Sequence, residues 1–282
     1  MTNVGYYNGK LGPFEEMTIP MSDRAIYFGD GVYDATTFCN NRIFAAKDHL
    51  DRFYNSCKLL EIKFDMPREE LIGELQKCID ATDADTGMLY WQATRGNGPR
   101  GHAFPPADVK PSLLIFTAPM GRVPLDTQAR LITMEDTRFL HCNIKTLNLI
   151  PSVIAYQRCC EQGCFETVFH RGDIVTECAH SNILMMKDGV VCTHPRNNLI
   201  LPGISLKHIL ELAPSVGLKT KEEPFTLEQL KAADEVIISS SGGLCIRAVE
   251  MDGQPIGGKD KEAFDKLQMA VEHHYLKDVG LE

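Results

Sequence analysis

The 282-residue sequence has no long apolar run, no dense run of lysine and arginine, and no pair of cysteines in CxxC spacing. Because no segment approaches the ~20 consecutive apolar residues that a bilayer requires, the sequence predicts no membrane span. Acidic residues number 38 and basic residues 29. That balance disfavours nucleic acid or an anionic membrane as a partner, so a small-molecule ligand is expected.

Signal-peptide and metal patterns are absent as well. The first residues, Met1–Gly5, carry neither the charged nor the apolar part of a signal peptide, and we expect a cytoplasmic protein. The ten cysteines are scattered, and the closest group, Cys159, Cys160 and Cys164, falls in a helical pattern. We interpret the cysteines as reduced thiols and predict no metal site.

The length and the 44% hydrophobic content predict about two globular domains. The stretch Ala118–Pro124 contains two prolines and a glycine, and it marks the expected boundary between the two domains. We therefore predict a small N-terminal domain at residues 1–118, a linker at 119–124 and a larger domain at 125–282. Strands and helices alternate irregularly, which favours an α+β fold over a doubly wound sheet.

Periodicity and turn residues predict the individual elements. Asn8-Gly9, Asn40-Asn41, Arg171-Gly172 and Asp188-Gly189 are typical of hairpin turns. Helical spacing predicts helices over residues 48–60, 67–80, 149–162, 205–213 and 261–276. Further strands are expected at residues 88–94, 112–117, 130–135, 235–239 and 245–250.

Two segments are suited to hold an anion. In Leu201–Ser205 a Pro-Gly turn leads into a helix, whose first N–H groups and dipole favour phosphate, although Ser205 could simply cap that helix. In Ser239–Gly243 a strand enters a turn rich in hydroxyl groups, which could form an anion nest or an ordinary loop. Neither segment has the spacing of a nucleotide-binding motif.

Other candidate functional residues are charged or basic side chains, each of which also has a purely structural explanation. The loop Arg95–His102 carries cationic donors suited to a carboxylate, or is a solvated loop. Lys145 lies among apolar residues, where a lysine can become a nucleophile, or extends from a loop into solvent. Glu177 ends an apolar run and is either a strand-end charge or the partner of a buried cation. His49 and Arg52 fit one helix face with surface ion pairs.

Five collinear blocks then carry a resemblance over nearly the whole chain. They are Asp23-Arg24 with Phe28–Tyr33, His49–Arg52, Asn143–Asn148, Thr176-Glu177 with Ser181-Asn182, and Leu201–Ile204. The chain resembles the fold-type IV class of pyridoxal-phosphate aminotransferases, most closely the bacterial D-amino acid aminotransferases. The resemblance implies two lobes: a small N-terminal α/β lobe and a larger, mixed β-barrel-like C-terminal lobe.

The resemblance also implies a cofactor, pyridoxal phosphate, and the residues that hold it. Lys145 matches the lysine that forms a Schiff base with the cofactor and then moves the proton. Glu177 matches the carboxylate that keeps the pyridine nitrogen protonated. The remaining matches form the phosphate cup and the ring contact, namely Arg52, Ile204, Ser205, Ser241 and Leu201.

Substrate residues follow from the same resemblance. Tyr33, Arg100 and His102 match the set that traps the substrate α-carboxylate, with the Arg-x-His loop reaching across a homodimer interface. His180 stands beside the cofactor where a small hydroxyl residue is usual, Asp34 stands where Glu is commoner, and Gly242-Gly243 alters the pocket loop.

The expected activity is transamination between a D-amino acid, such as D-alanine or D-glutamate, and a 2-oxo acid such as 2-oxoglutarate or pyruvate. Two alternatives have the same fold, a branched-chain L-aminotransferase and an aminodeoxychorismate lyase. A third alternative is a non-catalytic protein that binds carboxylates.

Overall fold

The computed structural model describes residues 3–282, which form two compact units. The first unit holds the described residues up to Gly121 together with Ile144–Asn148 and Lys277–Glu282, and the second holds Arg122–Asn143 and Leu149–Leu276. Neither unit is therefore continuous in the sequence. The linear division at residues 118 and 125 stays a prediction.

An antiparallel sheet of six strands forms the centre of the first unit, in the order β2-β1-β6-β5-β3-β4. Its strands are β1 (Val4–Tyr7), β2 (Lys10–Pro13), β3 (Gly31–Cys39), β4 (Arg42–Ile43), β5 (Thr86–Thr94) and β6 (Ser112–Pro119). The predicted hairpin between β1 and β2 is confirmed: its turn residues Asn8 and Gly9 have φ of 46° and 93°. Positive φ at both positions is what such a turn requires.

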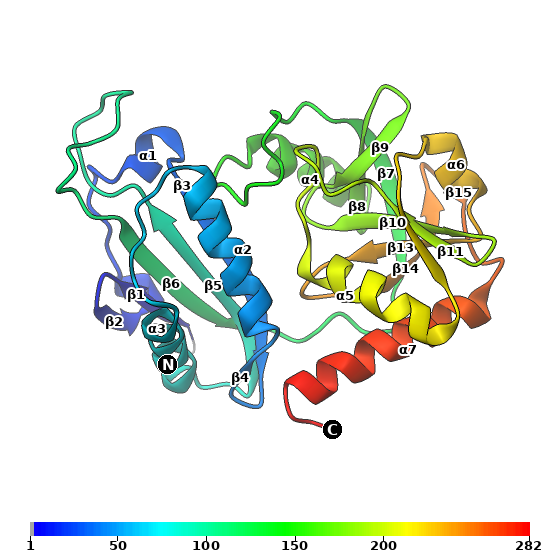
Figure 1. Ribbon diagram of the computed structural model, residues 1–282, viewed down its shortest axis with the longest axis horizontal. Helices are drawn as coiled ribbons and strands as arrows, with labels where there is room; N and C mark the ends of the chain where they lie inside the picture. The colour runs from blue at the N-terminus through cyan, green and yellow to red at the C-terminus, as the bar shows by residue number, and fades with distance from the viewer. Residues whose placement is uncertain (1–2) are drawn as a thin grey trace. The chain divides into compact units, whose positions relative to one another are not determined.

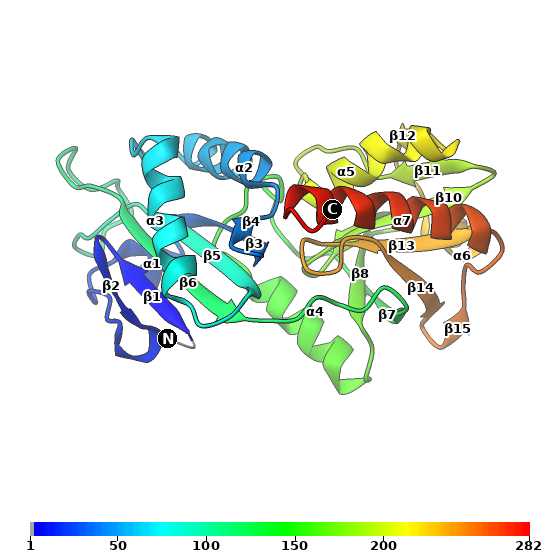
Figure 2. The same cartoon turned by 90° about the horizontal axis from the view of Figure 1, so that it is seen from below.

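Two helices, α2 (Ala46–Leu59) and α3 (Arg68–Ala81), cover one face of this sheet (Figures 1 and 2). Leu50 and Phe53 of α2 and Leu71 of α3 share a buried core with Trp91 of β5. The short helices η1 (Phe14–Glu16) and α1 (Arg24–Phe28) precede β3. Burial of one apolar stripe per helix holds this layer together.

A mixed nine-stranded sheet forms the centre of the second unit. Eight strands run in the order β12-β11-β10-β13-β14-β7-β8-β9, and β15 pairs with β14. They are β7 (Gln128–Glu135), β8 (Glu166–Arg171), β9 (Ile174–Cys178), β10 (Asn182–Lys187), β11 (Val190–Thr193), β12 (Lys219–Glu222), β13 (Glu235–Ser239), β14 (Ile246–Met251) and β15 (Gln254–Pro255). A three-residue turn joins the end strand β9 to β10, so the sheet curls back on itself.

The helices of the second unit are α4 (Ile150–Glu161), α5 (Ile204–Leu212), η2 (Ala213–Val216), α6 (Leu227–Ala232) and α7 (Lys261–Asp278). Figure 2 shows α4 on one side of the second sheet and α5 on the other. Ala155 of α4 packs against Phe169 of β8. This confirms the mixed helix and strand content that the sequence predicts.

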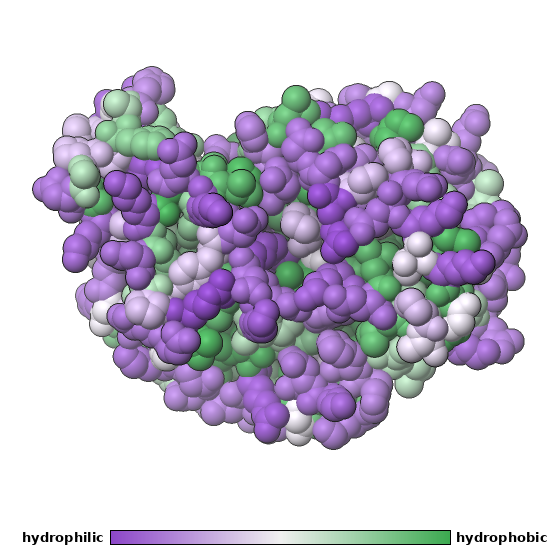
Figure 3. Space-filling model, viewed as in Figure 1, coloured by the Kyte–Doolittle hydropathy of each residue, from purple (hydrophilic) through white to green (hydrophobic). Residues whose placement is uncertain are grey.

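The face drawn in Figure 3 is mostly hydrophilic, and its apolar residues form small separate groups. The most exposed apolar group on a helix is on α4, where Ile150, Val153 and Ile154 are 69%, 59% and 51% exposed. Within residues 3–282, no helix is both long and apolar enough to span a membrane.

Candidate active site

Lys145 lies in a short segment that the first unit holds against β3. The backbone N–H of Tyr33 donates to the Lys145 carbonyl at 2.9 Å, and the Leu147 N–H donates to the Gly31 carbonyl at 3.1 Å. The Asn148 amide donates to the Gly29 carbonyl at 3.0 Å. Backbone pairing on both sides therefore fixes the position of Lys145.

The amine of Lys145 lies over an aromatic ring. Its Nζ is 4.4 Å from the centroid of the Tyr33 ring, within the range of a cation–π contact. Tyr33 stacks in turn on Tyr90, with ring centroids 5.3 Å apart. Two residues that the sequence singled out thus lie together, and a row of aromatic rings restricts their motion.

A second group in the first unit is a buried cluster of Asp34, His49 and Arg52. The Arg52 guanidinium donates two hydrogen bonds to the Asp34 carboxylate, at 2.7 and 2.8 Å. His49 Nδ1 is 2.8 Å from the same carboxylate. Arg52 and His49 hold the pKa of Asp34 well below its usual range, against the opposing effect of burial. The expectation of surface ion pairs at His49 and Arg52 is wrong, because both side chains are buried.

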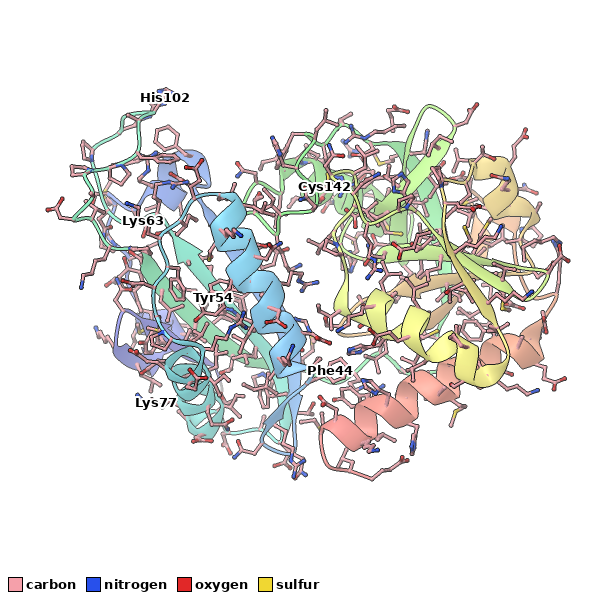
Figure 4. The ribbon with its side chains drawn as sticks, viewed as in Figure 1. Phe44, Tyr54, Lys63, Lys77, His102 and Cys142 are labelled. Carbon is pink, nitrogen blue, oxygen red and sulfur yellow. The ribbon has the colours of Figure 1, made fainter. Side chains whose placement is uncertain are left out.

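The loop that follows β5 carries Arg100 and His102, both exposed. His102 lies at the outer end of this loop (Figure 4), and its ring is 5.3 Å from that of Phe28. Arg24 donates to the Gly101 carbonyl at 2.8 Å, which anchors the loop. Within residues 3–282, neither Arg100 nor His102 forms a hydrogen bond or a ring contact with Tyr33.

Arg95 has a different role from its neighbours on this loop. It is buried, and its guanidinium donates to both oxygens of Asp30 at 3.0 Å. It also donates to the carbonyls of Leu60 and Glu61 at 2.7 and 2.9 Å. These contacts use its donors internally, so Arg95 is not part of a carboxylate site.

In the second unit, Glu177 at the end of β9 is buried and fully hydrogen-bonded. Arg138 donates to its Oε1 at 2.6 Å. Asn182 and the Leu201 backbone N–H donate to its Oε2 at 2.9 and 3.0 Å. Arg138 gives no signal in the sequence, because 39 residues separate it from Glu177.

A second carboxylate shares Arg138. Asp136 accepts two hydrogen bonds from the Arg138 guanidinium and one from the Arg138 backbone N–H, all at 3.0 Å, and one from Arg171 at 3.1 Å. Burial raises the pKa of Glu177 to about 7, while Arg138 acts in the opposite direction. Glu177 therefore titrates near neutral pH in the cofactor-free protein, and a cationic ligand at this carboxylate would favour its ionised form.

The two segments suited to an anion lie together. The Ser205 hydroxyl donates to the Ser240 carbonyl at 3.0 Å, and the Gly243 N–H donates to the Ser240 hydroxyl at 3.2 Å. Gly203 is the N-cap residue of α5, and no side chain caps this helix end. The alternative that Ser205 caps α5 is thus wrong.

Gly203 allows a close approach at this turn. A Cβ at this position would lie 2.0 Å from Asn182 Oδ1. The Asn182 amide donates both to Glu177 and to the Leu201 carbonyl, each at 2.9 Å. Asn182 therefore ties the carboxylate to the turn before α5. Within the described chain, no group of three or more side chains is placed to hold a metal ion.

A model of the family of class IV aminotransferases matches residues 31–251. The chain belongs to this family. The D-alanine aminotransferase of Staphylococcus epidermidis is 39% identical over 258 residues, which cover 91% of this chain and 91% of that protein. The D-alanine aminotransferase of Listeria monocytogenes is 40% identical over 280 residues, which cover 97% and 96%.

Solved structures agree on the fold of this class IV aminotransferase. The branched-chain amino acid aminotransferase of Escherichia coli superposes with a TM-score of 0.88, over 99% of this chain and 96% of the other, at 20% identity. Another branched-chain amino acid aminotransferase, solved with pyridoxamine 5'-phosphate, superposes with a TM-score of 0.89 at 22% identity. That match covers 100% of this chain and 96% of the other. The predicted fold-type IV architecture is therefore confirmed.

Proposed function

We propose that this class IV aminotransferase transfers the amino group of a D-amino acid, such as D-alanine or D-glutamate, to a 2-oxo acid. The observation that carries the proposal is the match to D-alanine aminotransferases at 39% and 40% identity over more than nine-tenths of the chain. The two branched-chain enzymes with the same fold are only 20% and 22% identical.

The residues present fit pyridoxal phosphate. A carboxylate buried among hydrogen-bond donors suits a protonated pyridine nitrogen, and the helix end at Gly203 suits a phosphate. We assign the ring nitrogen to Glu177, the ring face to Leu201, and the phosphate to Arg52, Ile204, Ser205 and Ser241. When bound, the cofactor accepts the electrons that remain after the substrate Cα–H bond breaks.

Lys145 has two tasks in this proposal. Its amine would hold the cofactor covalently when the cofactor is bound, and the same amine would take the proton from the substrate Cα. The backbone hydrogen bonds to Tyr33 and Gly31 fix the segment, so the amine reaches a defined atom. Such positioning is a principal source of rate enhancement.

Tyr33, Arg100 and His102 bind the substrate α-carboxylate. Arg100 and His102 are exposed on an anchored loop, and we propose that they act in the neighbouring subunit of a homodimer. The exposed apolar residues of α4 are suited to such an interface. The ten free cysteines agree with a cytoplasmic location.

A paired assay tests the function. The holoenzyme receives D-alanine, D-glutamate, L-leucine or L-valine with 2-oxoglutarate, and the D-forms should react with the higher kcat/KM. Arg100→Ala should raise KM for every D-donor and leave the cofactor absorbance unchanged, because the loss of a charged partner typically costs about 2–5 kcal/mol. A preference for L-leucine would establish the branched-chain alternative. Absence of absorbance that borohydride bleaches would leave only a carboxylate-binding role.

A further inference from the structure

His180, in the turn between β9 and β10, is paired with a buried carboxylate. Its Nδ1 is 2.6 Å from Glu166 Oε2. The Glu166 side chain is 0% exposed, whereas the His180 side chain is 55% exposed. The imidazole thus contacts a buried carboxylate with Nδ1, while about half of the side chain remains exposed to solvent.

The charge of Glu166 requires compensation in this position, because an isolated buried carboxylate is costly. Glu166 accepts hydrogen bonds from the Ser181 hydroxyl at 2.7 Å and the Thr167 N–H at 2.8 Å, which are neutral donors. Among the described residues, His180 is the one basic side chain that lies within salt-bridge distance of Glu166. The Nδ1 atom therefore faces the buried carboxylate, and the other ring nitrogen, Nε2, is directed away from Glu166.

Two further contacts fix the ring. Tyr156 of α4 packs edge-on against it, with ring centroids 4.7 Å apart. The Cys178 N–H donates to the Ser181 carbonyl at 2.8 Å and closes the turn. A positioned, half-exposed imidazole of this kind can bind an anion without the entropy cost of ordering a long side chain.

The turn also lies next to the carboxylate that we assign to the cofactor. It joins Glu177 at the end of β9 to Asn182 at the start of β10, and Asn182 donates to Glu177 at 2.9 Å. Within the second unit, His180 therefore lies in a turn whose two ends, Glu177 and Asn182, are hydrogen-bonded to each other.

We propose that His180 is a specificity-determining residue that binds a second carboxylate, in the side chain of an acidic D-amino acid or of a dicarboxylic 2-oxo acid. Glu166 is its positioning residue. The inference rests on the proposed transamination and adds to it a substrate class, D-glutamate and D-aspartate over uncharged donors.

The test compares a charged amino donor with an uncharged donor of similar shape and with a small uncharged donor. The holoenzyme and its His180→Gln variant receive D-glutamate, D-glutamine and D-alanine, with the uncharged acceptor 2-oxobutyrate. Glutamine can still donate to Glu166 but carries no charge. The kcat/KM for D-glutamate should fall about 10- to 100-fold, as for a lost charge-assisted hydrogen bond, while the other two donors change by less than about threefold. His180→Arg should retain the preference for D-glutamate.

His170→Gln is the matched control, since His170 lies in the same unit and its Nδ1 is 3.4 Å from Glu135. This variant should leave all three donors unchanged. Calorimetric binding gives a second readout: the parent should bind glutarate more tightly than butyrate, and His180→Gln should remove the difference. Equal losses for all donors, or no change in either readout, would overturn the assignment. If the parent transaminated no D-amino acid while the glutarate preference remained, the proposed function would fail and the role of His180 as a carboxylate binder would stand.

Discussion

Each unit holds a site carboxylate that is buried beside an arginine, Asp34 in the first unit and Glu177 in the second, and the pKa values of these two carboxylates shift in opposite directions. In the first, the Asp34 carboxylate has Arg52 and His49 as partners, which hold its pKa well below the usual range. In the second, Glu177 shares Arg138 with Asp136, and burial raises its pKa to about 7. The pKa is lowered at the carboxylate with two basic partners, whereas burial raises it at the carboxylate whose arginine also pairs with a second acid.

This difference suits two chemical tasks. Arg52 on a permanently ionised Asp34 is a fixed cation, as the binding of a phosphate requires. Glu177 gains most from a cationic partner, as a protonated pyridine nitrogen would provide. The environment, rather than the residue type, separates the two roles.

The largest expected effect comes from a change that leaves both clusters in place. Lys145→Ala should lower kcat by about 10⁴-fold or more, because neither cluster offers another amine to bind the cofactor or move the proton. Unfolding curves and circular dichroism should match the parent. Lys47→Ala, at an exposed position of α2, is the control and should keep full activity. Reduction by borohydride followed by mass spectrometry should place the cofactor on Lys145, and label on another lysine would contradict the assignment.

Asp34→Asn breaks the fixed pair. It leaves Arg52 buried with a neutral partner, and the free energy of unfolding should fall by about 3–5 kcal/mol. Urea unfolding measures this loss. Asp51→Asn serves as control, because Asp51 pairs with Lys47 at 2.8 Å but is about half exposed. Equal effects of the two substitutions would mean that burial gives the Asp34 pair no special importance.

Glu177→Gln tests the second cluster by activity. A neutral amide cannot stabilise a protonated ring nitrogen, so kcat should fall about 100-fold while the cofactor remains bound. Single-turnover absorbance with D-alanine measures the rate. The control Glu222→Gln alters an exposed carboxylate in the same unit that pairs with Arg196. A rate equal to that of the parent would remove Glu177 from the mechanism.

The smallest expected effect is a difference in how the two carboxylates make the free energy of unfolding depend on pH. A raised folded-state pKa stabilises the cofactor-free protein below the unfolded value of 4.5, and this contribution is lost as pH rises through about 7. Relative to Glu177→Gln, the parent should therefore lose about 1–3 kcal/mol of unfolding free energy between about pH 5 and about pH 8.

The lowered pKa of Asp34 has the opposite sign, since its contribution is lost only as pH falls below the unfolded value of 3.8. The difference between the parent and Asp34→Asn should thus be the same at both pH values. A matching pH dependence for the two variants would contradict the contrast between the clusters.

Local signals in the sequence predicted much of the fold. The turns at Asn8-Gly9 and Asp188-Gly189 are confirmed, since both pairs have positive φ. The strand β12 was missed because all four of its residues are exposed and polar, so no alternation marks it. Helix α6 has a capping box of Thr226 and Gln229, a signal that could have found it.

The site was less accessible to such reasoning. Motif blocks singled out Lys145 and Glu177, and Tyr33 and Lys145 do lie together. The pairing of Glu177 with Arg138 depends on contacts between distant segments, for which one sequence carries no pattern. Arg95 was grouped with Arg100 on a loop, but its internal contacts depend on Asp30 and the end of α2, which spacing cannot reveal.

The discontinuity of the first unit limits how this protein can be divided or recombined. A fragment ending at Gly121 would lack Lys145, and the Tyr33 N–H would lose the carbonyl it donates to. It would also lack Asp278, which accepts a hydrogen bond from the Ala45 N–H at 2.7 Å. A gene exchange at residue 121 would therefore separate the first sheet from Lys145, so chimeras must keep residues 144–148 and 277–282 with the N-terminal parent.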